Sequence, residues 1–233
     1  MHKKPSHKKM YIAIFLVVIL CAATAAIIYA TQISKSGASV KAGVKVGVNV
    51  GDTFTYKLTG DSILFSSDAS TPAYLSEYNE TNYYEVIITG VNGSVVSFNT
   101  IWQFTNGTAI NNSGWINLET GNYSGNFWAI YPSNLKVTNL LYPKEENNAL
   151  IVNSTGSQSF SSGNRTTNYW HLESEFTDIN DPTGSTKQVS SIEVYFDKQT
   201  GMLDYLDNVQ EYNNPEYNIL ITWQLTGSSV WGV

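Results

Sequence analysis

Residues 188–226 read QVSSIEVYFDKQTGMLDYLDNVQEYNNPEYNILITWQLT, and this stretch decides the fold class. From Ile219 to Leu225 every second side chain is large and apolar, so these side chains share one face of an extended chain. A period of two residues is typical of β-strands that bury one face. Residues 197–201, DKQTG, are a turn sequence between two such runs. The stretch therefore predicts a three-stranded antiparallel meander.

The same period continues through most of the chain from Val48 onward. Residues 81–119 predict a second three-stranded meander. Asn92-Gly93 and Asn106-Gly107 fall between its apolar runs, and Asn-Gly is the preferred dipeptide of tight hairpin turns. Between the two meanders, residues 166–176 predict one long strand.

A large antiparallel sheet must hide one face against other parts of the chain. The fold class is therefore mainly β, either one strongly curved antiparallel sheet forming an open half-barrel or a two-sheet sandwich. Beyond the N-terminal segment only short helices are expected, and residues 124–131, just before Pro132, are the one place that favours a helix.

The first thirty residues predict where the β domain resides. Residues 1–10 are a basic tail with four lysines and no acid, and residues 11–30 carry no charge. A helix of about 20 residues is about 30 Å long, which matches the hydrocarbon core of a bilayer and exceeds the apolar part of an export signal. The lysines favour a cytoplasmic N-terminus. We predict a transmembrane signal-anchor over 11–30, with the C-terminal domain extracellular.

Two alternatives to a retained helix are open at this stage. Ala23-Thr24-Ala25 fits a small-x-small cleavage site. Cys21 is a potential lipid attachment point, although Leu20 departs from the lipobox pattern, which has a small residue just before the cysteine. Residues 31–46 mix Ser, Gly and Lys and predict a flexible stalk. Residues 47–233 are then an extracytoplasmic β domain.

The charge and cysteine content exclude some functions. Residues 31–233 carry nine basic and nineteen acidic groups, a net charge of −10. Nucleic-acid binding needs clustered Lys and Arg, so nucleic acid is excluded as a partner. The single cysteine lies in the predicted membrane segment, so the exported part forms no disulfide and must bury its own core.

Asn-x-Ser/Thr sequons, the acceptors of N-linked glycans, occur only in the part predicted to be outside the cell. Several fall in predicted turns, where a bulky sugar can be accommodated. The seven predicted glycosylation sites are Asn79, Asn92, Asn106, Asn111, Asn122, Asn153 and Asn164.

Three longer motifs carry a family resemblance. They are VGDTFTYKLTG at 50–60, GWINLETGNYSGNFWAIYPSNL at 114–135 and VYFDKQTGMLDYL at 194–206. Their order resembles an uncharacterised family of archaeal cell-surface proteins, in which an anchor and stalk carry a sequon-rich β domain. In shape, such turns also resemble the half-wrapped β-barrels of periplasmic lipoprotein carriers and mycobacterial lipoproteins. The first resemblance implies no catalytic motif, and the second implies a cavity for lipid.

His171 is the only histidine outside the cytoplasmic tail. A zinc site therefore lacks ligands, and no Gly-x-Ser-x-Gly motif supplies a hydrolase nucleophile. In NYWHLESEF, His171, Glu173 and Glu175 share one face of the predicted strand. They form either a polar ligand face or, more simply, a solvated face. We predict no catalytic residue, no cofactor and no metal.

Two further segments have a functional and a plain interpretation. Residues 178–184, DINDPTG, partly resemble a calcium loop but favour an Asx/Pro-Gly turn, because the terminal bidentate Glu is missing. Residues 127–131, FWAIY, suit a sugar-stacking platform or a lid over a lipid cavity, but aromatic side chains of β proteins more often fill the core.

The sequence as a whole predicts a non-catalytic, membrane-anchored surface protein. Its role would be adhesion, envelope structure or partner binding, with an envelope protein, a glycan or a lipid as partner. The first alternative is a lipid or apolar-ligand carrier. The second is an extracellular glycan hydrolase, which requires His171 or the Glu173/Glu175 pair to lie in a cleft beside a carboxylate such as Glu193 or Asp204.

Overall fold

The computed structural model of the chain describes residues 44–145, 150–177, 183 and 187–233. The predicted tail 1–10, the anchor 11–30 and nearly all of the stalk 31–46 lie outside these residues. Within the described part, no helix has the length and apolar character needed to cross a membrane.

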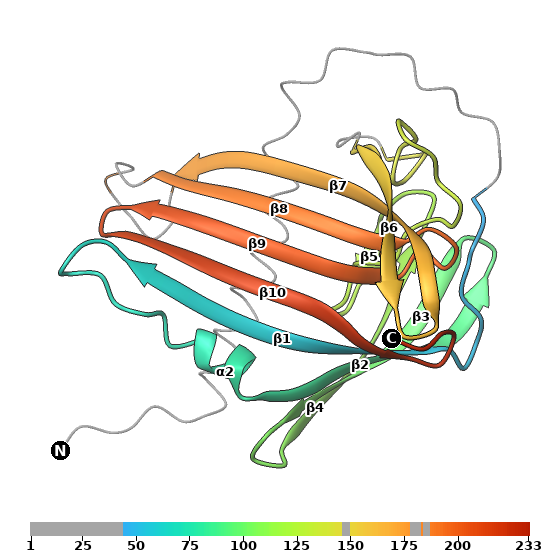
Figure 1. The fold of residues 1–233 in the computed structure, drawn as a ribbon, viewed down its shortest axis with the longest axis horizontal. Coiled ribbons are helices and arrows are strands. Elements are labelled where there is room, and N and C mark those ends of the chain that lie inside the picture. Colours follow the sequence, from blue (N-terminus) through green and yellow to red (C-terminus); the bar gives the residue numbers. More distant parts are fainter. Residues whose placement is uncertain (1–43, 146–149, 178–182, 184–186) are drawn as a thin grey trace.

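The described part of the chain contains ten strands and one short helix (Figure 1). The elements are β1 (Thr53–Leu64), α2 (Leu75–Asn79), β2 (Thr81–Asn92), β3 (Val95–Phe104), β4 (Ala109–Asn117), β5 (Tyr123–Ser124), β6 (Ser154–Phe160), β7 (Gly163–Thr177), β8 (Lys187–Asp197), β9 (Leu203–Asn213) and β10 (Glu216–Ser228).

All ten strands belong to one antiparallel sheet, in the order β5-β4-β3-β2-β1-β10-β9-β8-β7-β6. The sheet does not close, because β5 and β6 are its two edges. Figure 1 shows β2 and β4 turned away from the plane of β7 to β10. The single open sheet agrees with the first of the two predicted architectures, and the two-sheet sandwich is wrong.

Both predicted meanders are confirmed. The first consists of β2, β3 and β4, and the second of β8, β9 and β10. The glycines of the two Asn-Gly turns, Gly93 and Gly107, have φ angles of 59° and 85°, a left-handed conformation that glycine adopts without strain. These turns set the register of the hairpins that they connect.

The prediction of a helix over 124–131 is wrong. This segment contains the end of β5 and an isolated bridge from Ile130 to Met202, and the one described helix is α2. Gly125, with a φ of 100°, and the following Pro132 both disfavour a helix here.

Helix α2 fills a fork in the sheet. β1 pairs with β2 over only four residues, from Thr53 to Tyr56, while its pairing with β10 continues to Leu64. Beyond the fork, the Asn79 side chain takes the place of a neighbouring strand: its Oδ1 accepts from Gly60 N at 3.0 Å and its Nδ2 donates to Gly60 O at 2.7 Å. The backbone of β1 is therefore satisfied where β2 leaves it.

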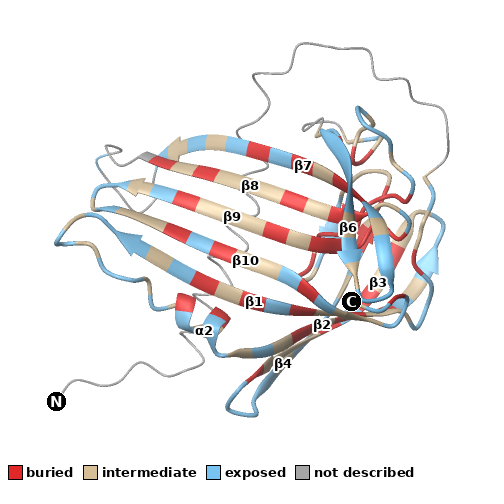
Figure 2. Ribbon diagram, in the orientation of Figure 1, coloured by how far each residue is buried: buried red, intermediate tan, exposed pale blue. Residues whose placement is uncertain are grey.

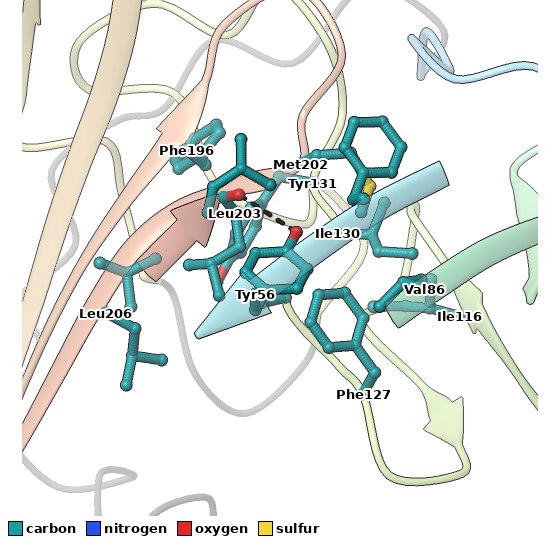
Figure 3. Close-up of a cluster of buried hydrophobic side chains, with 14 of the residues drawn as sticks. Tyr56, Val86, Ile116, Phe127, Ile130, Tyr131, Phe196, Met202, Leu203 and Leu206 are labelled. Atoms are coloured by element: carbon teal, nitrogen blue, oxygen red, sulfur yellow. Dashed lines mark hydrogen bonds between the residues drawn. The ribbon is translucent and has the colours of Figure 1, made fainter. Parts of the chain in front are cut away.

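The core lies on one face of the sheet. Along β1, Phe54, Tyr56 and Leu58 are buried, as their spacing predicts, and Figure 2 shows buried residues interspersed with intermediate or exposed ones along β7 to β10. The irregular segment 125–142 packs onto this face and contributes buried side chains such as Phe127. Figure 3 shows Phe127 beside Tyr56, whose hydroxyl donates to Leu203 O at 3.1 Å.

The turn 197–201 attaches that irregular segment to the sheet. Tyr131 N donates to Gly201 O at 2.9 Å. Gly201 has a φ of 78°, and a Cβ atom there would collide with the carbonyl oxygen of Tyr131. At the other end of the segment, Ser133 N donates to Lys45 O at 2.8 Å, and Val46 packs against the core. Three parts of the chain therefore meet here: the turn 197–201, the irregular segment and residues 45–46.

Candidate functional site

Three tyrosines line up across the face of the sheet opposite the core. Tyr169 on β7 is paired with Tyr195 on β8, which is paired with Tyr205 on β9. The ring centroids are 4.8 Å apart between the first two and 6.2 Å apart between the second two, with interplanar angles of 39° and 62°. We call these three residues the tyrosine row.

A second row runs beside the first, at a distance of two residues on each strand. His171 on β7 is paired with Glu193 on β8, and Glu193 is paired with Asp207 on β9. His171 is exposed, and the two acids are half-buried. We call these three residues the polar row, and both rows together the outer-face array.

Hydrogen bonds connect the two rows. The Tyr169 hydroxyl donates to Glu193 Oε1 at 3.1 Å, and the Tyr205 hydroxyl donates to Asp207 Oδ2 at 2.8 Å. Asp207 Oδ1 also accepts from the Thr222 hydroxyl of β10 at 2.6 Å. Side chains restrained in this way lose little conformational freedom when they bind a ligand, so the array is preorganised.

The tyrosines of the array stay protonated at neutral pH. Partial burial, assisted by the negative charge of Glu193, raises the pKa of Tyr169 to about 12. Burial, followed by Glu193 and Asp207, also raises the pKa of Tyr195. The hydroxyls therefore act as hydrogen-bond donors to the carboxylates, and the charge of this face comes from the acids.

The structure places the predicted polar face on this side of the sheet. His171, Glu173 and Glu175 are all exposed, whereas Trp170 and Leu172, on either side of His171, are buried. His171 lies opposite Glu193 on β8, and Glu193 is one of the two carboxylates that the hydrolase alternative considers as a neighbour. Glu173 and Glu175 lie opposite Ser191 and Val189, which are not acids.

Asp204, the other carboxylate considered for that alternative, lies on the core side of the sheet. Its exposed fraction is 1%, and within the described part of the chain neither carboxylate oxygen has a hydrogen-bond partner. Pairing slips here by one residue, since Tyr195 faces Tyr205 while Phe196 faces Leu203, and Asp204 is the additional residue. Such a β-bulge re-aims a side chain, in this case into the core.

Asp204 lies near a second buried acid, Asp197. Asp197 is fully buried but well satisfied: Arg165 donates to both of its oxygens, from Nε at 2.8 Å and Nη2 at 3.0 Å. The Thr200 backbone N and hydroxyl also donate to Asp197 Oδ1, at 2.7 and 2.8 Å. Burial, assisted by the charge of Asp197 and opposed by Arg165, raises the pKa of Asp204 to about 8. Asp204 is thus mainly neutral at pH 7.

The other sequence-predicted features are distributed elsewhere. Among the described residues, no group of three or more His, Cys, Asp or Glu side chains is placed to hold a metal ion. Apart from Thr183, the possible calcium loop 178–184 lies outside the described residues. The segment 127–131 belongs to the core, where Phe127 packs against Tyr56, Tyr84 and Phe98.

All seven sequon asparagines are exposed. Asn79 differs from the others because its Nδ2, the atom that would carry a glycan, donates to Gly60 O. In Asn106, Asn153 and Asn164 the hydrogen bonds found use Oδ1 and leave Nδ2 available for attachment. Glycosylation itself stays a prediction.

Sequence reasoning did not find the tyrosine row. One signal was present: Tyr195 and Tyr205 flank the turn 197–201, so a hairpin brings them together. Tyr169 gave no such signal, because the length of the β7–β8 connection does not fix which residues of these strands pair.

Comparison with known proteins adds no family to this description. No protein-family model matches the chain, and no match was found among curated proteins.

Proposed function

We propose that the chain is a membrane-anchored, extracellular surface protein whose non-catalytic β domain binds a partner through the outer-face array. The observation that carries the proposal is the pair of aligned rows on β7 to β9, in which two of the three tyrosines, Tyr169 and Tyr205, donate hydrogen bonds to the two carboxylates. Membrane attachment would be through residues 11–30, with the N-terminus in the cytoplasm.

The positions of the sequons support this choice of face. All seven lie between Asn79 and Asn164, and strands β8, β9 and β10 contain none. Asn153, whose Oδ1 accepts from His171 N at 3.0 Å, borders the array at its β7 edge. If the sequons are used, glycans would cover the part of the domain between α2 and the start of β7 and leave β8 to β10 bare for a partner.

The two alternative functions have less support. A lipid carrier needs an apolar cavity, but Phe127 and Tyr131, with exposed fractions of 2% and 0%, occupy the core face against which a lipid would pack. A glycan hydrolase needs an acid and a base on either side of a sugar. Glu193 and Asp207 instead lie side by side on one face and accept hydrogen bonds from tyrosines.

Mass spectrometry of the intact protein, purified from its own membranes, tests the anchor and the glycans. We expect a polypeptide that retains residues 11–30, and glycans at exposed turn sequons such as Asn92, Asn106 and Asn122 but not at Asn79. A chain that begins after Ala25 and is recovered from the soluble fraction would contradict the anchored topology.

A photo-reactive residue at Ser191, which lies between Glu173 and Val209 on the outer face, tests partner binding. Irradiation of the full chain in its native envelope should yield a discrete cross-linked product. The same group at exposed Asp68, far along the chain from the array, is the control and should yield none. Equal cross-linking at both positions would contradict binding by this face, and so would a lack of cross-linking at both.

A further inference from the structure

The outer-face array is acidic, and its strands supply few cations. Strands β9 and β10 contain no Lys or Arg. The only such residue in β7 is Arg165, which is engaged with Asp197, and the only one in β8 is Lys187 at its far end. Within the described part of the chain, the ion pairs found are Arg165–Asp197 and Lys144–Glu119, and neither involves the array.

Within this acidic face, two carboxylates are placed directly opposite each other. Glu193 and Asp207 are paired residues on neighbouring antiparallel strands. Side chains in such positions have Cβ atoms about 5 Å apart, and like charges there destabilise the sheet. A cation placed between the two carboxylates would remove this repulsion and gain favourable contacts with both.

The tyrosine row offers the same kind of ligand a second contact. The ring faces of Tyr169, Tyr195 and Tyr205 carry negative electrostatic potential, which attracts lysine and arginine side chains within about 6 Å. Their interplanar angles of 39° and 62° show that they do not form one flat surface. A flat surface would suit stacking of a sugar ring, whereas inclined rings beside carboxylates suit cationic groups that enter between them.

From these observations we propose that the outer-face array binds a basic segment of a polypeptide, through lysine or arginine side chains seated between the tyrosine row and the carboxylates Glu193 and Asp207. This inference rests on the proposed function and names the chemistry of its partner. An arginine suits the position best, because its planar guanidinium donates to two carboxylates at once and stacks on an aromatic ring.

The test measures binding of the full chain, held in nanodiscs of zwitterionic lipid, to three probes. These are an octa-arginine peptide, an octa-glutamate peptide and a neutral hexasaccharide. The dissociation constant of octa-arginine should rise about tenfold or more between low and high salt, because exposed ion pairs are screened. Octa-glutamate should not bind.

Paired variants localise the binding. Glu193→Gln combined with Asp207→Asn keeps an acceptor for each tyrosine hydroxyl and should weaken octa-arginine binding about tenfold, as expected for charge pairs at an interface. The matched control, Asp68→Asn with Glu80→Gln, removes the same charge at exposed positions outside the array and should leave binding unchanged. Tyr195→Leu should weaken binding about threefold to tenfold, and Tyr83→Leu on β2 is its control.

The outcomes separate this inference from the proposed function. Equal weakening by the array variant and its charge control would overturn the inference, since the peptide would then bind the acidic surface in general. A second outcome is that the hexasaccharide binds, Tyr195→Leu abolishes this binding, and octa-arginine does not bind. This outcome would overturn the inference of a cationic partner but retain the face as a binding site. Binding of no probe, together with no cross-linking at Ser191, would overturn both. Circular dichroism and thermal unfolding confirm that each variant is folded.

Discussion

The β8–β9 hairpin carries two pairs of acids, and they have opposite environments. Asp197 and Asp204 are buried near the turn, with exposed fractions of 0% and 1%. Glu193 and Asp207 lie on the outer face and are half-buried. In the buried pair, Arg165 neutralises the charge of Asp197, and Asp204 is mainly neutral at pH 7 because it holds its proton. Among the described residues, the outer pair accepts hydrogen bonds from hydroxyl groups, which leave both negative charges in place.

The difference indicates how the two pairs of acids are used. Buried charges must be neutralised within the fold, because their desolvation is costly. Charges on a wet surface carry no such requirement and are free to attract a partner. Substitutions in the core pair should therefore change stability, and substitutions in the outer pair should change binding.

The largest expected effect is the pH dependence of stability that Asp204 confers. Its folded-state pKa of about 8 exceeds the unfolded value, so the folded state holds the proton more tightly. Its contribution is fully present below about pH 4 and is lost as the pH rises to 8, a change of about 5 kcal/mol in the free energy of unfolding. In Asp204→Asn this component should vanish, so that urea denaturation gives a variant more stable than the wild type at pH 8. Identical pH profiles for the two proteins would contradict the raised pKa.

Removal of the arginine from the buried pair should have the next largest effect. Arg165→Met leaves Asp197 buried without its cation, which costs about 3–5 kcal/mol. Lys144→Met is the control, because Lys144 and Glu119 form an ion pair whose side chains are 64% and 30% exposed. Such pairs contribute about 1 kcal/mol or less. Denaturant midpoints at pH 7 measure both, and equal losses would mean that burial does not distinguish the two ion pairs.

A smaller effect is expected from the hydroxyl group of the turn. Thr200→Val keeps the shape of the side chain but removes the donor to Asp197 Oδ1 at 2.8 Å. A hydrogen bond to a charged group contributes about 1.5–3 kcal/mol, and the low end is expected here because Thr200 N and Arg165 still donate to the same oxygen. Thr222→Val, which removes the donor to Asp207 on the wetter face, should cost less. Thermal unfolding measures both losses of stability. A larger loss for Thr222→Val would show that the hydrogen bond to half-buried Asp207 contributes more than the one to buried Asp197, contrary to this expectation.

The smallest change in stability should come from the outer pair itself. Glu193→Gln and Asp207→Asn each retain the hydrogen-bond acceptor and relieve a like-charge contact, so unfolding free energies should stay within about 0.5 kcal/mol of the wild type. The same substitutions should give the large losses of octa-arginine binding described above. Destabilisation by more than about 2 kcal/mol would instead assign this pair a structural role.

Period-two patterns predicted the faces of β1, β3, β7 and β10, and Asn-Gly dipeptides predicted two hairpins, because both signals are local. The pairing of Tyr169 with Tyr195 depends on tertiary register, which no local pattern contains. The inward turn of Asp204 depends on a bulge, and strict alternation places Leu203 and Tyr205 on one face, contrary to the structure. The segment 127–131 belongs to the core, as expected, but it is not helical. Its contact with the turn at Gly201 joins residues far apart in the chain, which no local pattern contains.

The additional residue in β9 has a consequence for how the chain tolerates length changes. Deleting a residue from a regularly paired strand exchanges the faces of everything beyond the cut. Deleting Asp204 would do the opposite: Leu203 already faces Phe196 and Tyr205 already faces Tyr195, so the shortened strand would recover plain alternation with every remaining neighbour unchanged. This point in the middle of the sheet is therefore able to lose an amino acid without a shift in register, a freedom usually confined to surface loops.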